Sequence, residues 1–374
     1  MTDGLHMSRR IRRTPYTSKV EQAGVRGFSV VNHTLLPKAF QPSVEEDYWH
    51  LREHVQLWDV GCQRQVQIQG PDAAKLVQWM TPRDINQALV GDCFYIPIID
   101  ADAGLINDPV MLKLAEDKFW LSIADSDVLL YAMGLALGRD MDVQICEPDV
   151  SPLAIQGPKA EALLATLFGE QVCDIGFFKF GWIKFKGSHQ LIARSGFCRQ
   201  GGFEIYLEGG HLGADLWDFI WHAGQAFNIT PGCPNLIERI EGGLFSYGNE
   251  MTRENNPLEI GLDKFCSLDG SIDYIGRQAL EKIARDGVAR KIRGIIFDGE
   301  ACPTCSIPWP VMVEQQQVGQ ITSGIWSPRL KANVGQSLIE RGFWEFGQEV
   351  VVVTTDGQHR QGKIVKMPMA DLSA

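Results

Sequence analysis

The sequence of 374 residues lacks the features of several large protein classes. No apolar run approaches the roughly 18 residues that a membrane-spanning helix needs. The arginines near the N-terminus are not followed by the apolar stretch of a secretion signal. Lys and Arg number 35 against 46 Asp and Glu, so we expect no surface that broadly attracts nucleic acid or anionic lipid. The composition therefore predicts neither a membrane protein nor a nucleic-acid-binding one.

Common cofactor and nucleophile motifs are also missing. The chain has no G-x-G-x-x-G after an expected strand, no Walker loop and no G-x-S-x-G elbow, which argues against nucleotide cofactors and against serine hydrolase chemistry. Its nine cysteines are an odd number and lie scattered along the chain. This pattern is typical of free thiols in a reducing compartment, so we expect a cytoplasmic protein without a disulfide framework.

Two short patterns resemble metal or redox motifs, but little else supports them. His50 and His54 in HLREH have the H-x-x-E-H spacing of inverted zinc peptidases, yet no downstream carboxylate stands out as a third ligand. Cys302 and Cys305 form a lone C-x-x-C in a β-rich region and do not open a helix, as a thioredoxin-like site would. We therefore interpret both patterns as structural and predict no metal site.

One phrase occurs twice. Residues 66–79 read VQIQGPDAAKLVQW, and residues 153–166 read LAIQGPKAEALLAT. Each describes a strand that ends at glycine, with proline at the first helical position and an amphipathic helix after it. Two such units 87 residues apart predict an internally duplicated α+β fold and not a short-period solenoid.

The remaining pattern gives the expected elements and domains. Ser43 and Glu46 have capping-box spacing and open a helix that we expect to reach Trp58. Further helices are expected at 128–137, capped by Asp125 or Ser126, and at 212–227. From about Arg290 the chain is almost wholly short strands with turn signals, which predicts a C-terminal β-barrel. Strands are expected before it at 64–69, 93–99, 108–114, 179–186, 188–194 and 204–208, and the domains at 1–150, 151–285 and 286–374.

Polar residues gather where strands are expected to end. Asp108 follows a glycine turn and precedes an apolar strand, so it is either a carboxylate at the mouth of a sheet or a turn cap. Strand alternation puts Glu204 and Tyr206 on one face and apolar Phe203 and Ile205 on the other. The face with Glu204 is either a binding surface or a solvent-facing one.

A later segment, ERIEGGLFSYGNEMTRENNPLEIGLDKF, is too polar and too rich in glycine to be only core. It supplies Arg239, Glu241, Tyr247 and Asn249, and we expect a ligand there. Arg239 either meets an anionic group of that ligand or forms a buried ion pair with Glu241.

Seven spaced segments carry a resemblance over essentially the whole chain. They are QGP at Gln156, GLINDPV at Gly104, GGFEIYL at Gly201, RIEGGLFSYGNE at Arg239, PLEIGLDKF at Pro257, YIGRQAL at Tyr274 and GQITSGIWSPRLKAN at Gly319.

Together these segments resemble the folate-dependent aminomethyltransferase family, the glycine cleavage T-protein and its relatives. The resemblance implies an α+β fold in which two related lobes and a third, ferredoxin-like piece enclose a central folate site, closed by a C-terminal β-barrel. It also implies tetrahydrofolate as the cofactor that accepts the one-carbon group. The repeated IQGP phrase would then mark matching corners of the two lobes, with an architectural role.

Within the family, several segments are similar to members that remove a methyl group from a small zwitterionic sulfonium compound. The chain has Asn107-Asp108 where the T-protein has two aspartates, Ala124 where it has asparagine, and SGFCRQGG in place of its threonine-glycine-glutamate-aspartate loop. These departures surround the donor site, so we expect a methyl transfer from the zwitterion to N5 of tetrahydrofolate. The alternatives are an aminomethyltransferase, a betaine-type demethylase and a non-catalytic folate-binding module. The module is disfavoured because GSIDYIGRQ lacks the cysteine of its signature.

Roles for single residues follow from the resemblance and the chemistry. Asp108 is the expected catalytic carboxylate, Glu204 should accept hydrogen bonds from the pterin, and Arg239 and Tyr247 lie at pterin-side positions. Aromatic walls can hold a sulfonium by cation–π attraction. The wall candidates, of which the first three would also contact the cofactor, are Tyr95, Phe197, Tyr206 and Trp326. The expected partners are the zwitterion and folate, with no nucleic acid or membrane, and a homodimer is compatible with the sequence.

Overall fold

The computed structural model describes residues 8–302 and 305–372, and the chain divides into two compact units. The first unit comprises the chain up to Val77 together with Ile85–Tyr95 and Pro109–Asn235. The second comprises Gln78–Asp84, Ile96–Asp108 and the chain from Leu236 onward. Each unit is described by itself.

A six-stranded sheet forms the centre of the first unit. All neighbours pair antiparallel except the last two strands, which are parallel. One face of this sheet is buried under α1 (Thr17–Gln22), α5 (Ala160–Phe168) and α6 (Gly213–Gly224) in the largest apolar core of the unit. In spatial order the strands are β12 (Phe180–Phe185), β13 (Ser188–Ala193), β14 (Gly202–Glu208), β11 (Val150–Gln156), β3 (Val55–Asp59) and β15 (Ile229–Gly232).

A second, antiparallel sheet of five strands completes the first unit, together with a two-stranded hairpin, β1 (Gly27–Val31) and β2 (Thr34–Ala39). The helix α4 (Val128–Gly138) lies between β9 and β10 in the chain. The five strands in spatial order are β10 (Gln144–Cys146), β4 (Gln65–Gln69), β9 (Lys118–Ser122), β8 (Val110–Ala115) and β5 (Cys93–Tyr95).

The repeated IQGP phrase forms the same corner in both sheets. In the first copy β4 turns at Gly70 into α3 (Ala73–Met80), and in the second β11 turns at Gly157 into α5. Both glycines have a positive φ, 137° and 118°. A Cβ at Gly70 would lie 2.7 Å from the carbonyl oxygen of Asp142, and one at Gly157 would lie 2.3 Å from that of His54. Glycine is therefore required at both corners, and each helix begins two residues after the proline and not at it.

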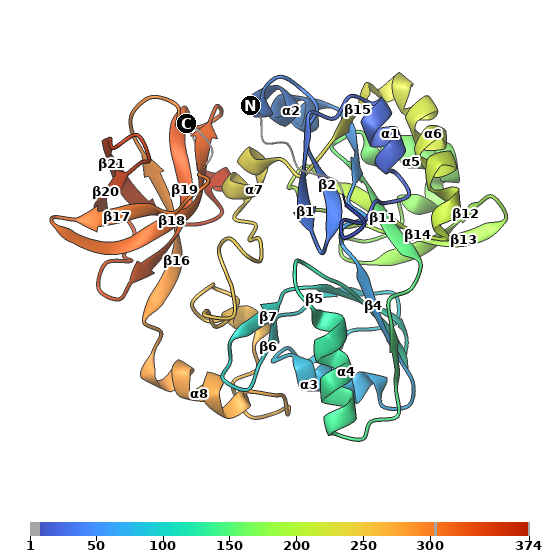
Figure 1. The fold of residues 1–374 in the computed structure, drawn as a ribbon, viewed down its shortest axis with the longest axis horizontal. Helices are drawn as coiled ribbons and strands as arrows, with labels where there is room; N and C mark the ends of the chain where they lie inside the picture. Colours follow the sequence, from blue (N-terminus) through green and yellow to red (C-terminus); the bar gives the residue numbers. More distant parts are fainter. Residues whose placement is uncertain (1–7, 303–304, 373–374) are drawn as a thin grey trace. The chain divides into compact units, whose positions relative to one another are not determined.

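The second unit is built around a closed six-stranded barrel, shown in orange to red in Figure 1. It also contains α7 (Leu236–Gly242), α8 (Arg277–Asp286) and the strand pair β6 (Ile98–Ile99) and β7 (Leu105–Asn107). The helix α7 contacts β18 and β19 of the barrel. Around the barrel the strands are β16 (Arg290–Phe297), β19 (Ala332–Glu340), β18 (Gln316–Ser327), β17 (Trp309–Val313), β20 (Glu349–Val353) and β21 (His359–Val365).

Three details of the expected secondary structure are wrong. The strand expected at 93–99 is divided into β5 and β6, which belong to different sheets. The helix that opens at Ser43 is α2 (Val44–Glu53), and Ser43 caps it by accepting the Glu46 amide at 3.1 Å, but residues 55–59 form β3 and not a further helical turn. Neither Asp125 nor Ser126 occupies the N-cap position of α4, which is Asp127. Asp125 instead accepts the backbone amide of Asn32 at 2.7 Å. None of the helices in the described ranges is both long and apolar enough to span a membrane.

Candidate functional site

Glu204 is a buried carboxylate near the middle of β14, with 6% of its surface exposed. Its Oε2 accepts a hydrogen bond from the Ser195 hydroxyl at 2.5 Å, and the Tyr206 hydroxyl is a second partner. Burial raises the pKa of Glu204, and the two hydroxyl groups offset part of this rise. The solvent-facing alternative for this strand face is therefore wrong. Glu204 is an ionisable group that the fold has removed from water without a basic partner in the described chain.

Small side chains flank Glu204 on its face of the sheet. The strand register places Glu204 opposite Ala154 of β11 on one side and Ala193 of β13 on the other. Ala154 in turn lies opposite Trp58 of β3, and the two pack together in a small apolar cluster. The carboxylate is thus bordered by two methyl groups, with an indole one strand beyond Ala154.

Tyr206 and Tyr95 contribute to the same region of the first unit. The Tyr206 ring is 1% exposed and packs in an apolar cluster with Cys93 and Trp120, its centroid 6.4 Å from the Trp120 ring. Burial and the charge of Glu204 raise the pKa of Tyr206 far above its usual value, so its hydroxyl stays protonated. Tyr95 lies two residues after Cys93 on β5, hence on the same face of that strand, and is half-buried.

Phe197 belongs to the loop that joins β13 to β14. Its half-buried ring, with Cys198, packs against the cluster that contains Trp58 and Ala154. It therefore lies on the Glu204 side of the six-stranded sheet. The first unit thus places Phe197, Glu204 and Tyr206 on one side of the six-stranded sheet, and Tyr95 lies on the strand whose Cys93 packs with Tyr206.

The other four predicted residues lie in the second unit. Arg239 on α7 is buried and makes an ion pair with Glu250 at 2.8 Å. Its second guanidinium nitrogen donates to Ser323 of β18 at 2.6 Å, and the Ser323 hydroxyl in turn donates to Glu250. The alternative of an ion pair with Glu241 is wrong, because Arg239 pairs with Glu250 and Glu241 accepts from Arg329 at 3.0 Å. A buried structural network accounts for the Arg239 side chain, and its predicted role in ligand binding is untested.

Asp108 and Tyr247 lie near each other in the second unit. Asp108 follows β7 and is half-buried at a junction between strands. The Tyr247 hydroxyl donates to the Leu105 carbonyl at 2.9 Å. Burial raises the pKa of Tyr247, and the negative charge of Asp108 adds to the rise. Trp326, the last of the four, is half-buried on β18, three residues after Ser323.

The two histidines of HLREH lie on α2 with ring centroids 5.0 Å apart. Each has a polar neighbour: His50 Nδ1 is 3.2 Å from the Thr230 hydroxyl, and His54 Nδ1 is 2.8 Å from the Lys159 amine. Burial lowers the pKa of His50. The described residues contain no group of three His, Cys, Asp or Glu side chains that could hold a metal ion, so the two histidines have no third ligand beside them.

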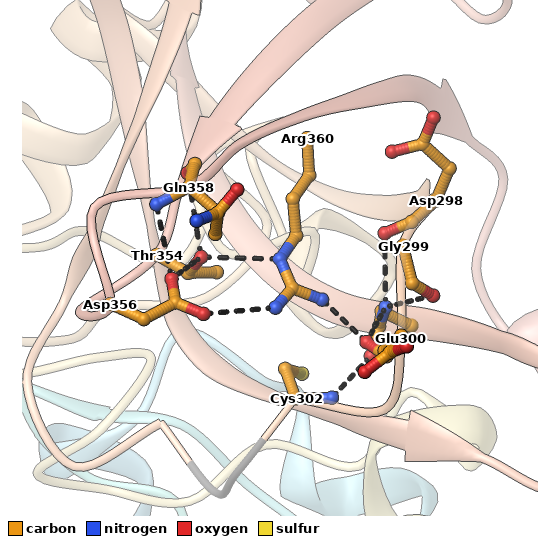
Figure 2. Close-up of polar contacts among 9 residues, drawn as sticks. Asp298, Gly299, Glu300, Cys302, Thr354, Asp356, Gln358 and Arg360 are labelled. Carbon is orange, nitrogen blue, oxygen red and sulfur yellow. Dashed lines mark hydrogen bonds and ion pairs between the residues drawn. The ribbon is translucent and has the colours of Figure 1, made fainter.

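The cysteines of C-x-x-C lie beside a polar network at one end of the barrel, although the two residues between them are outside the described ranges. Figure 2 shows Arg360 joining the β20–β21 turn to the turn after β16: it donates to Asp356 at 3.2 Å and to the Glu300 carbonyl at 2.5 Å. The Cys302 backbone amide donates to Asn333 Oδ1 at 2.9 Å. Burial raises the pKa of both thiols to about 11. The polar network therefore binds the backbone at Cys302, and both thiols stay protonated at neutral pH.

Sequence reasoning missed Ser195, the hydroxyl that binds Glu204. Ser195 lies two residues beyond Ala193, the β13 residue opposite Glu204, and therefore points to the same face. The register between β13 and β14 identifies it, but register is a long-range property. A serine in a glycine-containing loop gave no local signal of its own.

Comparison with known proteins identifies the family. A family model described as the GCVT N-terminal domain matches residues 16–270, and one described as the glycine cleavage T-protein C-terminal barrel domain matches residues 290–371. The chain belongs to the glycine cleavage T-protein family. The resemblance drawn from the sequence is confirmed, as are the α+β fold and the C-terminal barrel.

Relatives within the T-protein family fall at two levels of similarity. The chain is 50% identical over 350 residues to the dimethylsulfoniopropionate demethylase DmdA of Ruegeria pomeroyi, covering 94% of this chain and 95% of the relative. It is 31% identical over 348 residues to the aminomethyltransferase of Clostridium botulinum strain Okra, covering 90% and 91%. The crystal structure of aminomethyltransferase T from Bartonella henselae superposes with a TM-score of 0.86 over 97% of this chain and 99% of that one, at 21% identity. That structure confirms the T-protein fold.

Proposed function

We propose that this chain is a tetrahydrofolate-dependent demethylase. It transfers a methyl group from the sulfonium of dimethylsulfoniopropionate to N5 of tetrahydrofolate, and the products are methylthiopropionate and 5-methyltetrahydrofolate. The observation that carries this proposal is the difference in identity between the two kinds of relative, 50% for the demethylase and 31% for the aminomethyltransferase, at similar coverage.

The sequence departures on the donor side favour the same substrate. Asn107 replaces the first of the two aspartates that are usual in the T-protein, and this asparagine is fully buried on β7, where a second carboxylate would be costly. The loop that contains Phe197 also differs from the T-protein loop. Both changes are departures from the T-protein pattern on the donor side, and they weigh against an aminomethyl-lipoyl substrate.

The surroundings of Glu204 fit the pterin of tetrahydrofolate. A carboxylate can accept about four hydrogen bonds, and the hydroxyl groups of Ser195 and Tyr206 supply two. The pterin's amino and ring N–H groups are donors that match the remaining acceptor sites. Ala154 and Ala193 on either side add no long side chain that would cover the carboxylate. Glu204 is therefore the residue that we assign to pterin recognition.

The proposed reaction needs no protein nucleophile. The sulfonium methyl is already electrophilic: N5 would form the new bond with its lone pair while the carbon–sulfur bond breaks with its electron pair on sulfur. The methylated N5 would then release its proton to bulk solvent when the products leave. The chain must orient the two substrates and exclude water, which can lower a barrier by about 7 to 11 kcal/mol in favourable cases. Asp108 is the proposed carboxylate near the cationic sulfur. The proposed wall residues are Tyr95, Phe197 and Tyr206 of the first unit and, separately, Trp326 of the second.

A direct assay tests the proposal. Purified protein is incubated with tetrahydrofolate and, in separate reactions, with dimethylsulfoniopropionate, glycine betaine or aminomethyl-lipoyl carrier protein, and the folates are identified by mass spectrometry. We expect 5-methyltetrahydrofolate and methylthiopropionate from the sulfonium compound, without ammonia. Formation of 5,10-methylenetetrahydrofolate from the carrier protein, with dimethylsulfoniopropionate untouched, would assign the chain to the aminomethyltransferases.

We also propose that the enzyme acts in the cytoplasm, where reduced folate and free thiols both persist, and that it forms a homodimer. The described part of the chain contains no disulfide bond, which suits a reducing compartment. Sedimentation at micromolar concentration measures the oligomeric state, and a mass of one chain would reject the dimer.

A further inference from the structure

The two IQGP corners share a backbone but differ at the glutamine. Gln156 of the second corner is fully buried. Gln69 of the first corner is half-buried, and its Oε1 is 3.5 Å from Gln67 Nε2. Because both corners form with the same glycine geometry, the strand-to-helix turn does not itself require a buried glutamine. The burial of Gln156 needs a separate explanation.

Gln156 holds the loop between β13 and β14 from both ends. Its Nε2 donates to the carbonyl of Ser195, where the loop begins, and to that of Phe203, where β14 has begun, both at 3.2 Å. Its Oε1 accepts the Cys198 thiol from the middle of the loop at 3.0 Å. One amide therefore contacts the start, the centre and the end of the segment 195–203.

Two glycines bring this loop close to the amide. A Cβ at Gly196 would lie 2.0 Å from Gln156 Oε1, and one at Gly202 would lie 2.6 Å from Nε2, and both glycines have φ values above +140°. Contacts this short are impossible for any other residue without displacing the side chain. The loop backbone is therefore fitted to Gln156, and the loop carries Ser195 and Phe197.

We propose that Gln156 is a positioning residue that fixes the 195–202 loop and, with it, the hydrogen bond from Ser195 to Glu204. The inference rests on the proposed function, because it assigns the pterin to Glu204. Gln156 acts through the Ser195 hydroxyl, which orients the Glu204 carboxylate. The Glu204 carboxylate is then already in place before tetrahydrofolate binds. No binding free energy is lost in ordering this carboxylate.

The test compares Gln156→Met, a side chain of similar length without the amide, with Gln69→Met as the matched control in the first corner. Tetrahydrofolate affinity is measured by calorimetry without any methyl donor, and loop order by hydrogen exchange of residues 195–202. We expect Gln156→Met to weaken folate binding about 10-fold, which corresponds to about 1.4 kcal/mol, and to speed exchange in the loop. Turnover at saturating substrates should fall less than folate affinity does, because N5 and the sulfonium are unchanged and only the loop that carries Phe197 is loosened. Gln69→Met should match the wild type in every measurement.

A double-mutant cycle tests the route through Ser195. If Gln156 acts through this hydroxyl, Gln156→Met combined with Ser195→Ala should weaken folate binding no more than the larger single change. The inference would be overturned if the losses of folate affinity in the two single variants multiplied in the double variant. It would also be overturned if Gln156→Met kept the wild-type affinity and an ordered loop. If Gln156→Met does not fold, Gln156→Asn, which keeps an amide one methylene shorter, carries the same expectations. A wild type that binds tetrahydrofolate but leaves dimethylsulfoniopropionate untouched would overturn the proposed function alone.

Discussion

Glu204 in the first unit and Glu250 in the second are both buried carboxylates, but their partners differ. Glu250 receives Arg239 at 2.8 Å, together with the Ser323 hydroxyl and the Ser246 backbone amide at 2.8 Å. Glu204 receives two hydroxyl groups and no cation. The first unit buries a further carboxylate in the same way: Asp59 accepts from the Thr14 hydroxyl at 2.6 Å and the Gly61 amide at 3.1 Å.

This difference in partners predicts different roles for Glu250 and Glu204. An ionised carboxylate taken out of water costs several kcal/mol unless a countercharge and hydrogen bonds replace the lost hydration. The Arg239 and Glu250 pair has both, and it links α7 to β18 of the barrel. Glu204 has unused acceptor capacity and a raised pKa, which together mark candidate binding sites. The comparison predicts that changes at Arg239 damage the fold, whereas changes at Glu204 damage binding.

Arg239→Met should give the largest effect, because it leaves Glu250 buried without its countercharge. We expect a loss of about 3 to 5 kcal/mol in the free energy of unfolding of the second unit, measured by urea denaturation. Arg290→Met is the control, since Arg290 is 3.4 Å from Glu259 and more exposed, and should lose far less. If Arg239→Met is as stable as the wild type but binds folate poorly, Arg239 belongs to the ligand site and the comparison fails.

Asp108→Asn should reduce turnover roughly 100-fold while the protein stays folded, because the carboxylate lies at a strand junction and its proposed task is to orient the cationic donor. Turnover is measured as 5-methyltetrahydrofolate formed, and folding by circular dichroism. Asp102→Asn, an exposed residue of the preceding turn, is the matched control. Near-normal turnover of Asp108→Asn would reassign Asp108 to turn capping.

Glu204→Gln should weaken tetrahydrofolate binding by roughly 10- to 150-fold, the equivalent of losing one charge-assisted hydrogen bond of about 1.5 to 3 kcal/mol. The amide also presents a donor to the donors of the pterin. Unlike Arg239→Met, this variant should be at least as stable as the wild type at neutral pH, because it removes a buried charge. Glu208→Gln at the exposed end of the same strand is the control. Unchanged affinity by calorimetry would place the pterin elsewhere.

Asp59 extends the comparison to pH. Burial raises its pKa to about 7, against about 3.9 in an unfolded chain. The folded protein therefore binds this proton more tightly, and stability falls as pH rises from about 4 to 7, by up to about 1.4 kcal/mol per pH unit. Asp59→Asn should lack this contribution, so its unfolding free energy should decline less steeply over that interval. Parallel curves for variant and wild type would show that Asp59 does not titrate there.

The sequence predicted those parts of the fold that depend on local pattern. The strand-to-helix turn at both IQGP corners, a helix within 212–227 and the barrel from Arg290 agree with the prediction, because glycine, capping residues and strand alternation act over a few residues. The segment 55–59 was mistaken for helix because β3 is buried on both faces. Its apolar residues therefore show no alternation and continue the helical pattern of α2.

The site was predictable only in part, because some of its contacts join residues that are far apart in the sequence. Motif resemblance singled out Glu204 and Tyr206, and their common strand face follows from alternation. The clamp by Gln156 and the pairing of Arg239 with Glu250 depend on which strands and loops meet in space. Glu241 lies two residues from Arg239 in the sequence, yet the fold pairs that carboxylate with Arg329, 88 residues away.

The smallest effect is expected at Cys302 and Cys305, which lie beside the Arg360 network at one end of the barrel. Asn333 binds the Cys302 backbone and not its thiol, and Arg360 holds the neighbouring turn through the Glu300 carbonyl (Figure 2). Both thiols have a pKa near 11 and are protonated at neutral pH, so they are poor metal ligands and poor nucleophiles. Changing both to serine should leave turnover and metal content unchanged, as measured by the folate assay and by elemental analysis. Stoichiometric zinc in the wild type that the double variant loses would make this end of the barrel a metal site.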